Sequence, residues 1–162
     1  METNSESEKS SGFPPKWVLS PVDGSENASR ALKAAIEICK TFGAKLFIVT
    51  VTTRGETLDI GMDLPGHTSA LQKFYDEMDR RAERLLEDSA DLARREGLTN
   101  VETEAIPEFQ SVTKQILELS QKKKVDLIVM GTRGLGGFKR LLLGSVSSAV
   151  VTHADCNVLV IR

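Results

Sequence analysis

Cysteine, histidine and aromatic side chains are scarce in this chain. Its 162 residues include two cysteines, two histidines, one tryptophan and one tyrosine. Cys39 and Cys156 form no C-x-x-C motif and stand among apolar residues, so we expect reduced thiols rather than a metal or redox site. His67 and His153 have no serine, cysteine or carboxylate at an informative spacing, which argues against a catalytic histidine.

The chain also lacks a long apolar run and an excess of charge of one sign. No run approaches the roughly 20 apolar residues that cross a bilayer, and the polar N-terminus has no apolar stretch typical of a secretory signal. We therefore expect a cytoplasmic protein that does not associate with membranes. The formal net charge of −2 gives no reason to expect nucleic acid as a partner.

The remaining composition is that of an ordinary globular protein, with 40% hydrophobic and 27% charged residues. Residues 1–14 begin with a polar stretch rich in serine and glutamate, which predicts a disordered tail. Residues 15–162 have the length of one domain with one core.

Strand-like and helix-like patterns alternate along this domain. Short apolar or alternating runs predict five strands: Lys16–Pro21, Lys45–Thr52, Val101–Ile106, Val125–Met130 and Asn157–Arg162. Apolar residues at helical spacing predict a helix in each interval; Ser25 and Gly43 bound the first, and the last begins at about Ser145. Residues 53–69 predict a long loop, and Pro107 is expected to close the third strand.

This alternation predicts an α/β fold with a single open five-stranded parallel sheet and helices on both faces. The buried first, second and fourth strands should be central and the alternating Val101–Ile106 an edge, which favours the strand order 3-2-1-4-5. In such sheets ligands bind beyond the carboxyl ends of the strands, where the strand order reverses. Pro21-Val22-Asp23 and Met130-Gly131 lie at that point.

A glycine-rich segment follows the fourth predicted strand and leads into the last predicted helix. It contains Gly131-Thr132-Arg133-Gly134 and later Gly144-Ser145. Glycine permits positive φ and close approach of the backbone to a ligand, and a helix N-terminus attracts anions. Further phosphate contacts would come from the hydroxyls of Ser145 and Ser147 and from the cations Arg133, Lys139 and Arg140. Because the G-x-x-x-x-G-K-[ST] motif is absent, the segment predicts either a phosphate site or a glycine-rich surface loop.

Asp23 is the acidic residue expected to face this segment. It is either a turn residue before the N-cap Ser25 or a ligand-binding residue at the point where the strand order reverses. Asp23 is also the only candidate Mg²⁺ ligand there, and one carboxylate makes a weak site. No residue near the segment stands out as a general base, so we expect binding with slow or no hydrolysis.

The spacing of these glycines resembles a family signature. Gly131-x-x-Gly134, nine residues and then Gly144-Ser145 is similar to the G-2x-G-9x-G-[S/T] signature of ATP-binding universal stress proteins. Val18–Ser25, Val125–Gly131 and Val158–Ile161 resemble the family's first, fourth and last strands. The resemblance covers residues 16–162 and implies a Rossmann-like, adenine nucleotide alpha hydrolase-like fold.

The resemblance also implies a function. It implies a stress-response or signalling module that binds ATP, AMP or ADP with or without Mg²⁺, and a homodimer paired through Asn157–Arg162. The residues that it assigns to the nucleotide, together with the cation Arg133, are Pro21, Val22, Asp23, Val51, Met130, Gly131, Arg133, Gly134, Gly144, Ser145, Val146 and Ser147. Two alternatives stay open: a slow ATPase, and a dimeric interaction scaffold that needs no nucleotide.

Overall fold

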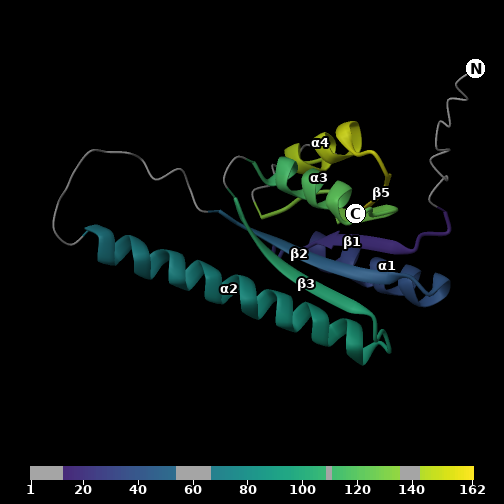
Figure 1. Ribbon diagram of the computed structural model, residues 1–162, viewed down its shortest axis with the longest axis horizontal. Coiled ribbons are helices and arrows are strands. Elements are labelled where there is room, and N and C mark those ends of the chain that lie inside the picture. The colour runs from purple at the N-terminus through teal and green to yellow at the C-terminus, as the bar shows by residue number, and fades with distance from the viewer. Residues whose placement is uncertain (1–12, 54–66, 109–110, 136–142) are drawn as a thin grey trace, which may run out of the picture.

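The computed structural model describes residues 13–53, 67–108, 111–135 and 143–162. Five parallel strands form one sheet in the order β3-β2-β1-β4-β5 (Figure 1), which confirms the predicted fold class and strand order. The strands are β1 (Trp17–Pro21), β2 (Lys45–Thr53), β3 (Val101–Glu108), β4 (Leu127–Gly131) and β5 (Asn157–Ile161). The helices of the described residues are α1 (Glu26–Phe42), α2 (His67–Arg95), α3 (Val112–Lys122) and α4 (Ser145–His153).

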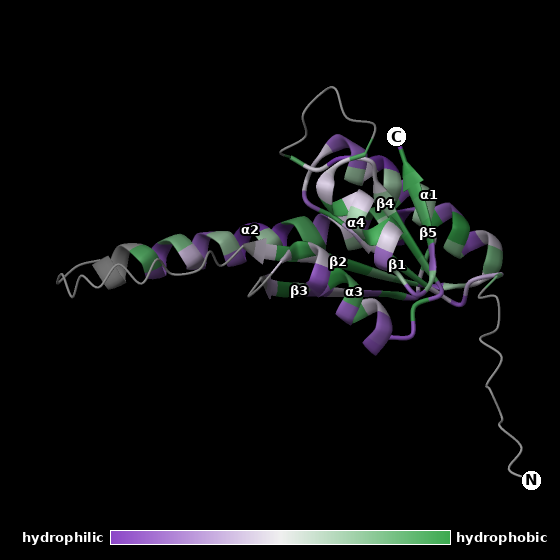
Figure 2. Cartoon of the chain, turned by 90° about the horizontal axis from the view of Figure 1, so that it is seen from above, coloured by the Kyte–Doolittle hydropathy of each residue, from purple (hydrophilic) through white to green (hydrophobic). Residues whose placement is uncertain are grey.

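The central strands are apolar along their length because both faces of the sheet are covered (Figure 2). Successive side chains of a strand point to opposite faces, so neighbours in sequence enter different cores. Leu46 and Ile48 pack with α1 and α2, whereas Phe47 and Val49 pack with α3 and α4. The helices therefore lie in two layers, with α1 and α2 on one face and α3 and α4 on the other.

The helix boundaries have local causes. Ser25 caps α1 by accepting a hydrogen bond from the Ala28 N–H at 3.2 Å, and Gly43 ends the helix with a φ of 69°. Ser111 caps α3 in the same way through the Lys114 N–H, also at 3.2 Å. By contrast, α4 begins after Gly144, which has no side chain to cap it. The predicted roles of Ser25 and Gly43 are confirmed.

Several predicted boundaries are wrong. The fourth strand, predicted over Val125–Met130, is observed as Leu127–Gly131. Pro107 does not close the third strand but lies within β3, paired in register with Thr52. This is tolerated because β3 is an edge strand, where a missing N–H faces no neighbour. The predicted loop 53–69 is too long at both ends, since Thr53 belongs to β2 and His67 is the first residue of α2. The rest of that loop, 54–66, and residues 1–12 of the predicted tail lie outside the described residues.

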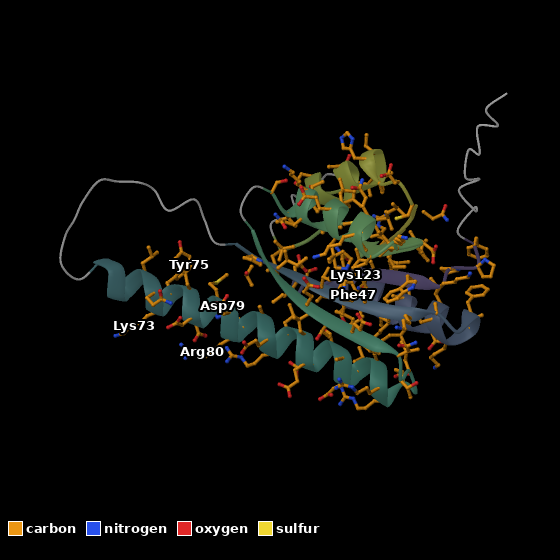
Figure 3. All side chains as sticks on the ribbon, in the orientation of Figure 1. Phe47, Lys73, Tyr75, Asp79, Arg80 and Lys123 are labelled. Atoms are coloured by element: carbon orange, nitrogen blue, oxygen red, sulfur yellow. The ribbon has the colours of Figure 1, made fainter. Side chains whose placement is uncertain are left out.

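The N-terminal half of α2 extends beyond the sheet (Figures 1 and 2). Lys73 and Tyr75 lie on this extension (Figure 3), and Leu71 and Phe74 expose 41% and 56% of their surface. Although α2 has 29 residues, charged side chains interrupt it throughout. In the described parts of the chain, no helix has the length and apolar character needed to cross a membrane.

Candidate functional site

A cavity of about 840 Å³ opens at the carboxyl ends of the strands. Its volume falls in the range of small-molecule sites. It lies where the strand order reverses. From β1 the chain continues to β2 and β3 on one side of the sheet, and β4 and β5 are added on the other side of β1. The turn after β1 is held to β2 by a hydrogen bond from the Val22 N–H to the Val49 carbonyl at 2.8 Å.

The structure brings the sequence-predicted site residues together around this one cavity. The lining includes Pro21, Val22, Asp23, Val51, Met130, Gly131, Arg133, Gly134, Gly144, Ser145, Val146 and Ser147. Two other predicted cations, Lys139 and Arg140, lie outside the described residues. Sequence reasoning missed the part of the wall formed by Ala28, Thr50, Thr52, Met78, Arg81, Ala82, Leu85, Val112 and Ile116. Most of these residues come from α2 and α3, and the spacing of apolar residues in a helix does not show which of them faces a cavity.

Asp23 joins the turn after β1 to the glycine segment. Its Oδ1 accepts a hydrogen bond from the Ser25 N–H at 2.9 Å, and its Oδ2 accepts one from the Leu135 N–H at 3.1 Å. A Cβ atom at Gly134 would clash with Asp23 Oδ2, so a larger residue there would displace the Asp23 carboxylate. Asp23 is thus a turn residue that also lines the cavity, and the two roles considered from the sequence do not exclude each other.

The other two glycines of the signature serve contacts within the chain. A Cβ at Gly131 would lie 2.8 Å from the Asn27 carbonyl carbon, so glycine lets the end of β4 approach the start of α1. Gly144 donates its N–H to the Thr132 carbonyl at 2.7 Å. None of the three signature glycines has a positive φ, because among the described glycines only Gly24, Gly43 and Gly97 do. The expectation of positive φ in the segment is therefore wrong for these positions.

Ser147 also serves the chain rather than the cavity. Its hydroxyl lies 2.8 Å from the Thr132 carbonyl and 3.1 Å from the Gly144 carbonyl, and its residue is buried. Since a hydroxyl has a single proton to donate, the predicted donation from this group to a phosphate does not agree with the structure. The backbone N–H groups of the first turn of α4 are the donors that a helix N-terminus offers.

Arg133 carries an unsatisfied polar atom. Its Nε is buried and has no hydrogen-bond partner among the described residues, and the side chain lines the cavity. A buried donor without an acceptor is unfavourable, because it has lost water and gained nothing in exchange. A ligand with acceptor oxygens in the cavity would supply the missing partner.

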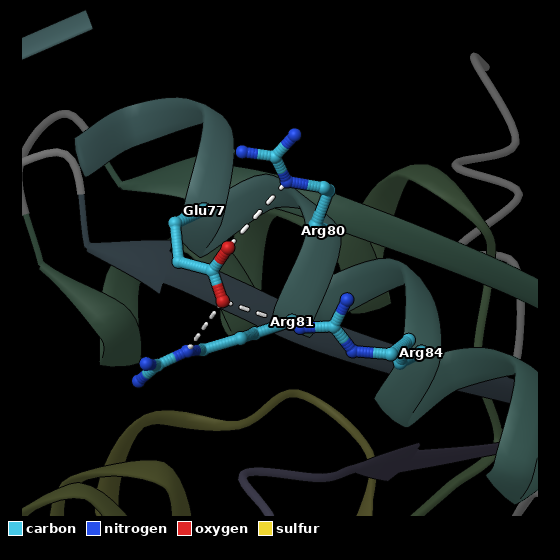
Figure 4. Close-up of polar contacts among 4 residues, drawn as sticks. All are labelled: Glu77, Arg80, Arg81 and Arg84. Atoms are coloured by element: carbon cyan, nitrogen blue, oxygen red, sulfur yellow. Dashed lines mark hydrogen bonds and ion pairs between the residues drawn. The ribbon is translucent and has the colours of Figure 1, made fainter. Parts of the chain in front are cut away.

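The charged residues of the wall are Asp23, Arg133 and Arg81. Arg81 donates from Nε to Glu77 Oε1 at 3.2 Å, and Arg80 and Arg84 also lie within ion-pair distance of Glu77 (Figure 4). The hydrogen bond from Arg81 is the largest cause that lowers the pKa of Glu77. Glu77 is therefore ionised at neutral pH.

Metal ligands are few at this site. The described residues contain no group of three or more histidine, cysteine, aspartate or glutamate side chains that could hold a metal ion. Asp23 is the only carboxylate in the described wall of the cavity, and both of its oxygens already accept backbone hydrogen bonds. The residues present do not fit a metal site built by the protein alone.

The fold and the site define a class: open parallel α/β proteins with a cavity at the reversal of strand order and a helix N-terminus in its wall. The sequence model of the universal stress protein family matches residues 15–162, and the chain belongs to this family. A putative universal stress protein of Staphylococcus haemolyticus is 38% identical over 154 residues, covering 91% of this chain and 84% of that protein. Universal stress protein MJ0531 of Methanocaldococcus jannaschii is 33% identical, with 91% and 82% covered.

Solved structures agree with this assignment. Universal stress protein UspA from Lactobacillus plantarum superimposes with a TM-score of 0.76 at 28% identity, covering 91% of this chain and 97% of that one. A universal stress protein crystallised in complex with cAMP gives a TM-score of 0.67 at 27% identity, with the same coverage.

Proposed function

We propose that this universal stress protein binds an adenine nucleotide in the cavity and acts as a stress-response or signalling module. One observation carries the proposal: a single cavity gathers the residues of the family signature, and Arg133 in its wall has a buried Nε with no partner among the described residues. The related structure in complex with cAMP supports the same class of ligand.

The chemistry of the wall suggests how a nucleotide would lie. The half-buried Val51 and buried Met130 offer apolar surface to the base, and Asp23 and Gly131 would contact the ribose. The first turn of α4, from Ser145 to Ser147, and Arg133 would hold the phosphates through backbone N–H groups and a guanidinium. ATP is the nucleotide proposed, and AMP and ADP share the base and ribose contacts.

Hydrolysis is expected to be slow or absent. A general base must be within hydrogen-bond reach of the attacking water, and Asp23 is already bonded through both oxygens. If Mg²⁺ accompanies ATP, its ligands would be mainly phosphate oxygens and water, as is usual for this ion. Mg²⁺ would there neutralise part of the phosphate charge.

Calorimetry of the purified protein with ATP and MgCl₂ tests the proposal. Wild-type protein should show saturable binding, and Arg133→Gln should weaken it by about ten-fold, because a hydrogen bond to a charged group is lost. Arg30→Gln is the matched control: Arg30 is exposed on α1 and paired with Glu26, and its loss should change affinity by less than about two-fold. Absence of heat with ATP, ADP and AMP alike would contradict the proposal.

We also propose a homodimer that forms by antiparallel pairing of β5 with its copy. β5 is an edge of the sheet, and Leu159 at its centre is 37% exposed. An open edge presents unpaired backbone groups to a second strand. The cytoplasmic location stays a prediction from the sequence.

A further inference from the structure

We propose that Arg81 is a base-recognition residue, whose guanidinium stacks on the adenine ring of the bound nucleotide. This inference rests on the proposed function and adds a specificity determinant on a helix that the glycine signature does not include. Arg81 belongs to the cavity wall, together with Met78, Ala82 and Leu85 of the same helix.

The position of α2 places Arg81 on the β2 side of the cavity, where the end of β2 contributes Thr50, Val51 and Thr52 to the wall. α2 packs against β2 and β3, whereas the glycine segment leaves β4 and enters α4 on the opposite face of the sheet. β2 and β4 are separated by β1, so their axes are about 10 Å apart at the usual strand spacing. Arg81 is therefore near the end of β2 on the face of Thr50 and Thr52, away from the first turn of α4, while Val51 beside them points to the opposite face.

The surroundings of Arg81 suit stacking better than phosphate binding. Its helical neighbours in the wall are apolar, and the Arg81 side chain itself is 69% exposed, so its guanidinium is accessible to a ligand beside an apolar surface. An arginine guanidinium is planar and weakly hydrated, and it stacks on aromatic faces more readily than a lysine ammonium does.

Glu77 holds this guanidinium in place. Its carboxylate oxygen Oε1 accepts from Arg81 Nε at 3.2 Å, one turn earlier on the same helix (Figure 4). Arg84 shares this oxygen at 3.3 Å, while Arg80 contacts the other oxygen at 3.5 Å. Arg81 is the only one of these three arginines in the described lining of the cavity. The chain thus contains a matched control, since Arg80 has the same charge and the same partner.

The test compares AMP with ATP. The two nucleotides share the base but differ in the number of phosphates, so the loss of a base contact should affect both equally and the loss of a phosphate contact should affect ATP more. Arg81→Met keeps the apolar stem and removes the planar cation, and it should weaken AMP and ATP equally, by about five-fold. Arg81→Lys keeps the charge but loses the planar guanidinium, so it should weaken AMP and ATP almost as much as Arg81→Met does. Arg80→Met should leave both affinities within about two-fold of wild type. Arg133→Gln should weaken ATP more than AMP, because it acts at the phosphate end.

Three outcomes would overturn the inference. Arg81→Met could leave AMP and ATP binding unchanged while wild type binds both, which would reject Arg81 and leave the proposed function intact. Arg81→Met could weaken ATP much more than AMP with rescue by lysine, which would make Arg81 a phosphate ligand. Failure of wild type to bind any adenine nucleotide would reject the proposed function and this inference together.

Discussion

Cys39 is a residue whose burial changes the response of the protein to pH. The side chain is fully buried in the core of α1 and α2, and burial raises the pKa of the thiol from its ordinary value of 9.0 to about 12. Between these values the unfolded chain has lost the thiol proton while the folded chain keeps it. Unfolding therefore releases a proton, and stability falls as pH rises above 9.

The expected result is a loss of about 2 kcal/mol between pH 8 and pH 10.5 that depends on Cys39. Urea unfolding of wild type and Cys39→Ala at both pH values measures it, because the alanine variant lacks this titration and shares all others. Cys156→Ala is the control, since that thiol is only half-buried and its pKa is raised less far. An identical pH dependence in wild type and Cys39→Ala would contradict the prediction.

Individual site residues differ in how far the sequence could predict them. The glycine spacing and the turn that contains Asp23 can be read directly in the sequence. The residues of the site near Gly131, Gly134 and Gly144 were therefore predictable. The physical reasons for these glycines were not predictable, because they come from contacts between distant segments: Gly131 lies against the Asn27 backbone, and Gly134 lies against the Asp23 carboxylate. Arg81 was missed for the same reason: only the packing of α2 on β2 brings it to the cavity.

At the scale of elements, α3 depends on its serine cap. Ser111 accepts from the Lys114 N–H, and the helix places Val112 and Ile116 in the cavity wall. Ser111→Ala should lower the free energy of unfolding by about 1 kcal/mol, since an N–H of the first turn loses its acceptor. Chemical denaturation should show a lower midpoint with an unchanged slope. Ser29→Ala, at an exposed position within α1, should change stability by less than about 0.5 kcal/mol, and an equal loss in both variants would contradict the role of the cap.

The boundaries of elements with a strong local signal were predicted well, whereas boundaries that depend on pairing within the sheet were not. The patterns of α1 and β2 agree closely with their observed bounds, because caps and buried runs are local features. β3 runs past Pro107, since register with β2 continues to Thr53 at an edge that tolerates proline. α2 begins at His67, before Leu71, the first residue of its apolar stripe, so periodicity alone places the start of the helix too late.

At the scale of the whole molecule, the order of the strands both makes the cavity and leaves an edge open. β1 lies at the centre with β2 and β4 beside it, so the segments after β1 and β4 diverge and leave space between them. The same order puts β5 at the outside, with exposed and half-buried residues alternating along most of it. No residue of β5 is in the described lining of the cavity, so this strand can be changed without altering the described wall of the site.

A charge at the centre of β5 tests the proposed dimer. Antiparallel pairing about a two-fold axis would bring the two copies of this strand side by side, so Leu159→Lys should place like charges close together and raise the dimer dissociation constant at least about ten-fold. Sedimentation velocity measures this, and Phe42→Lys, a similarly exposed position at the end of α1, should leave the dimer unchanged. Because Leu159 is not in the described lining of the cavity, the variant should keep its ATP affinity. A wild-type monomer, or a Leu159→Lys dimer as tight as wild type, would place the interface elsewhere than β5.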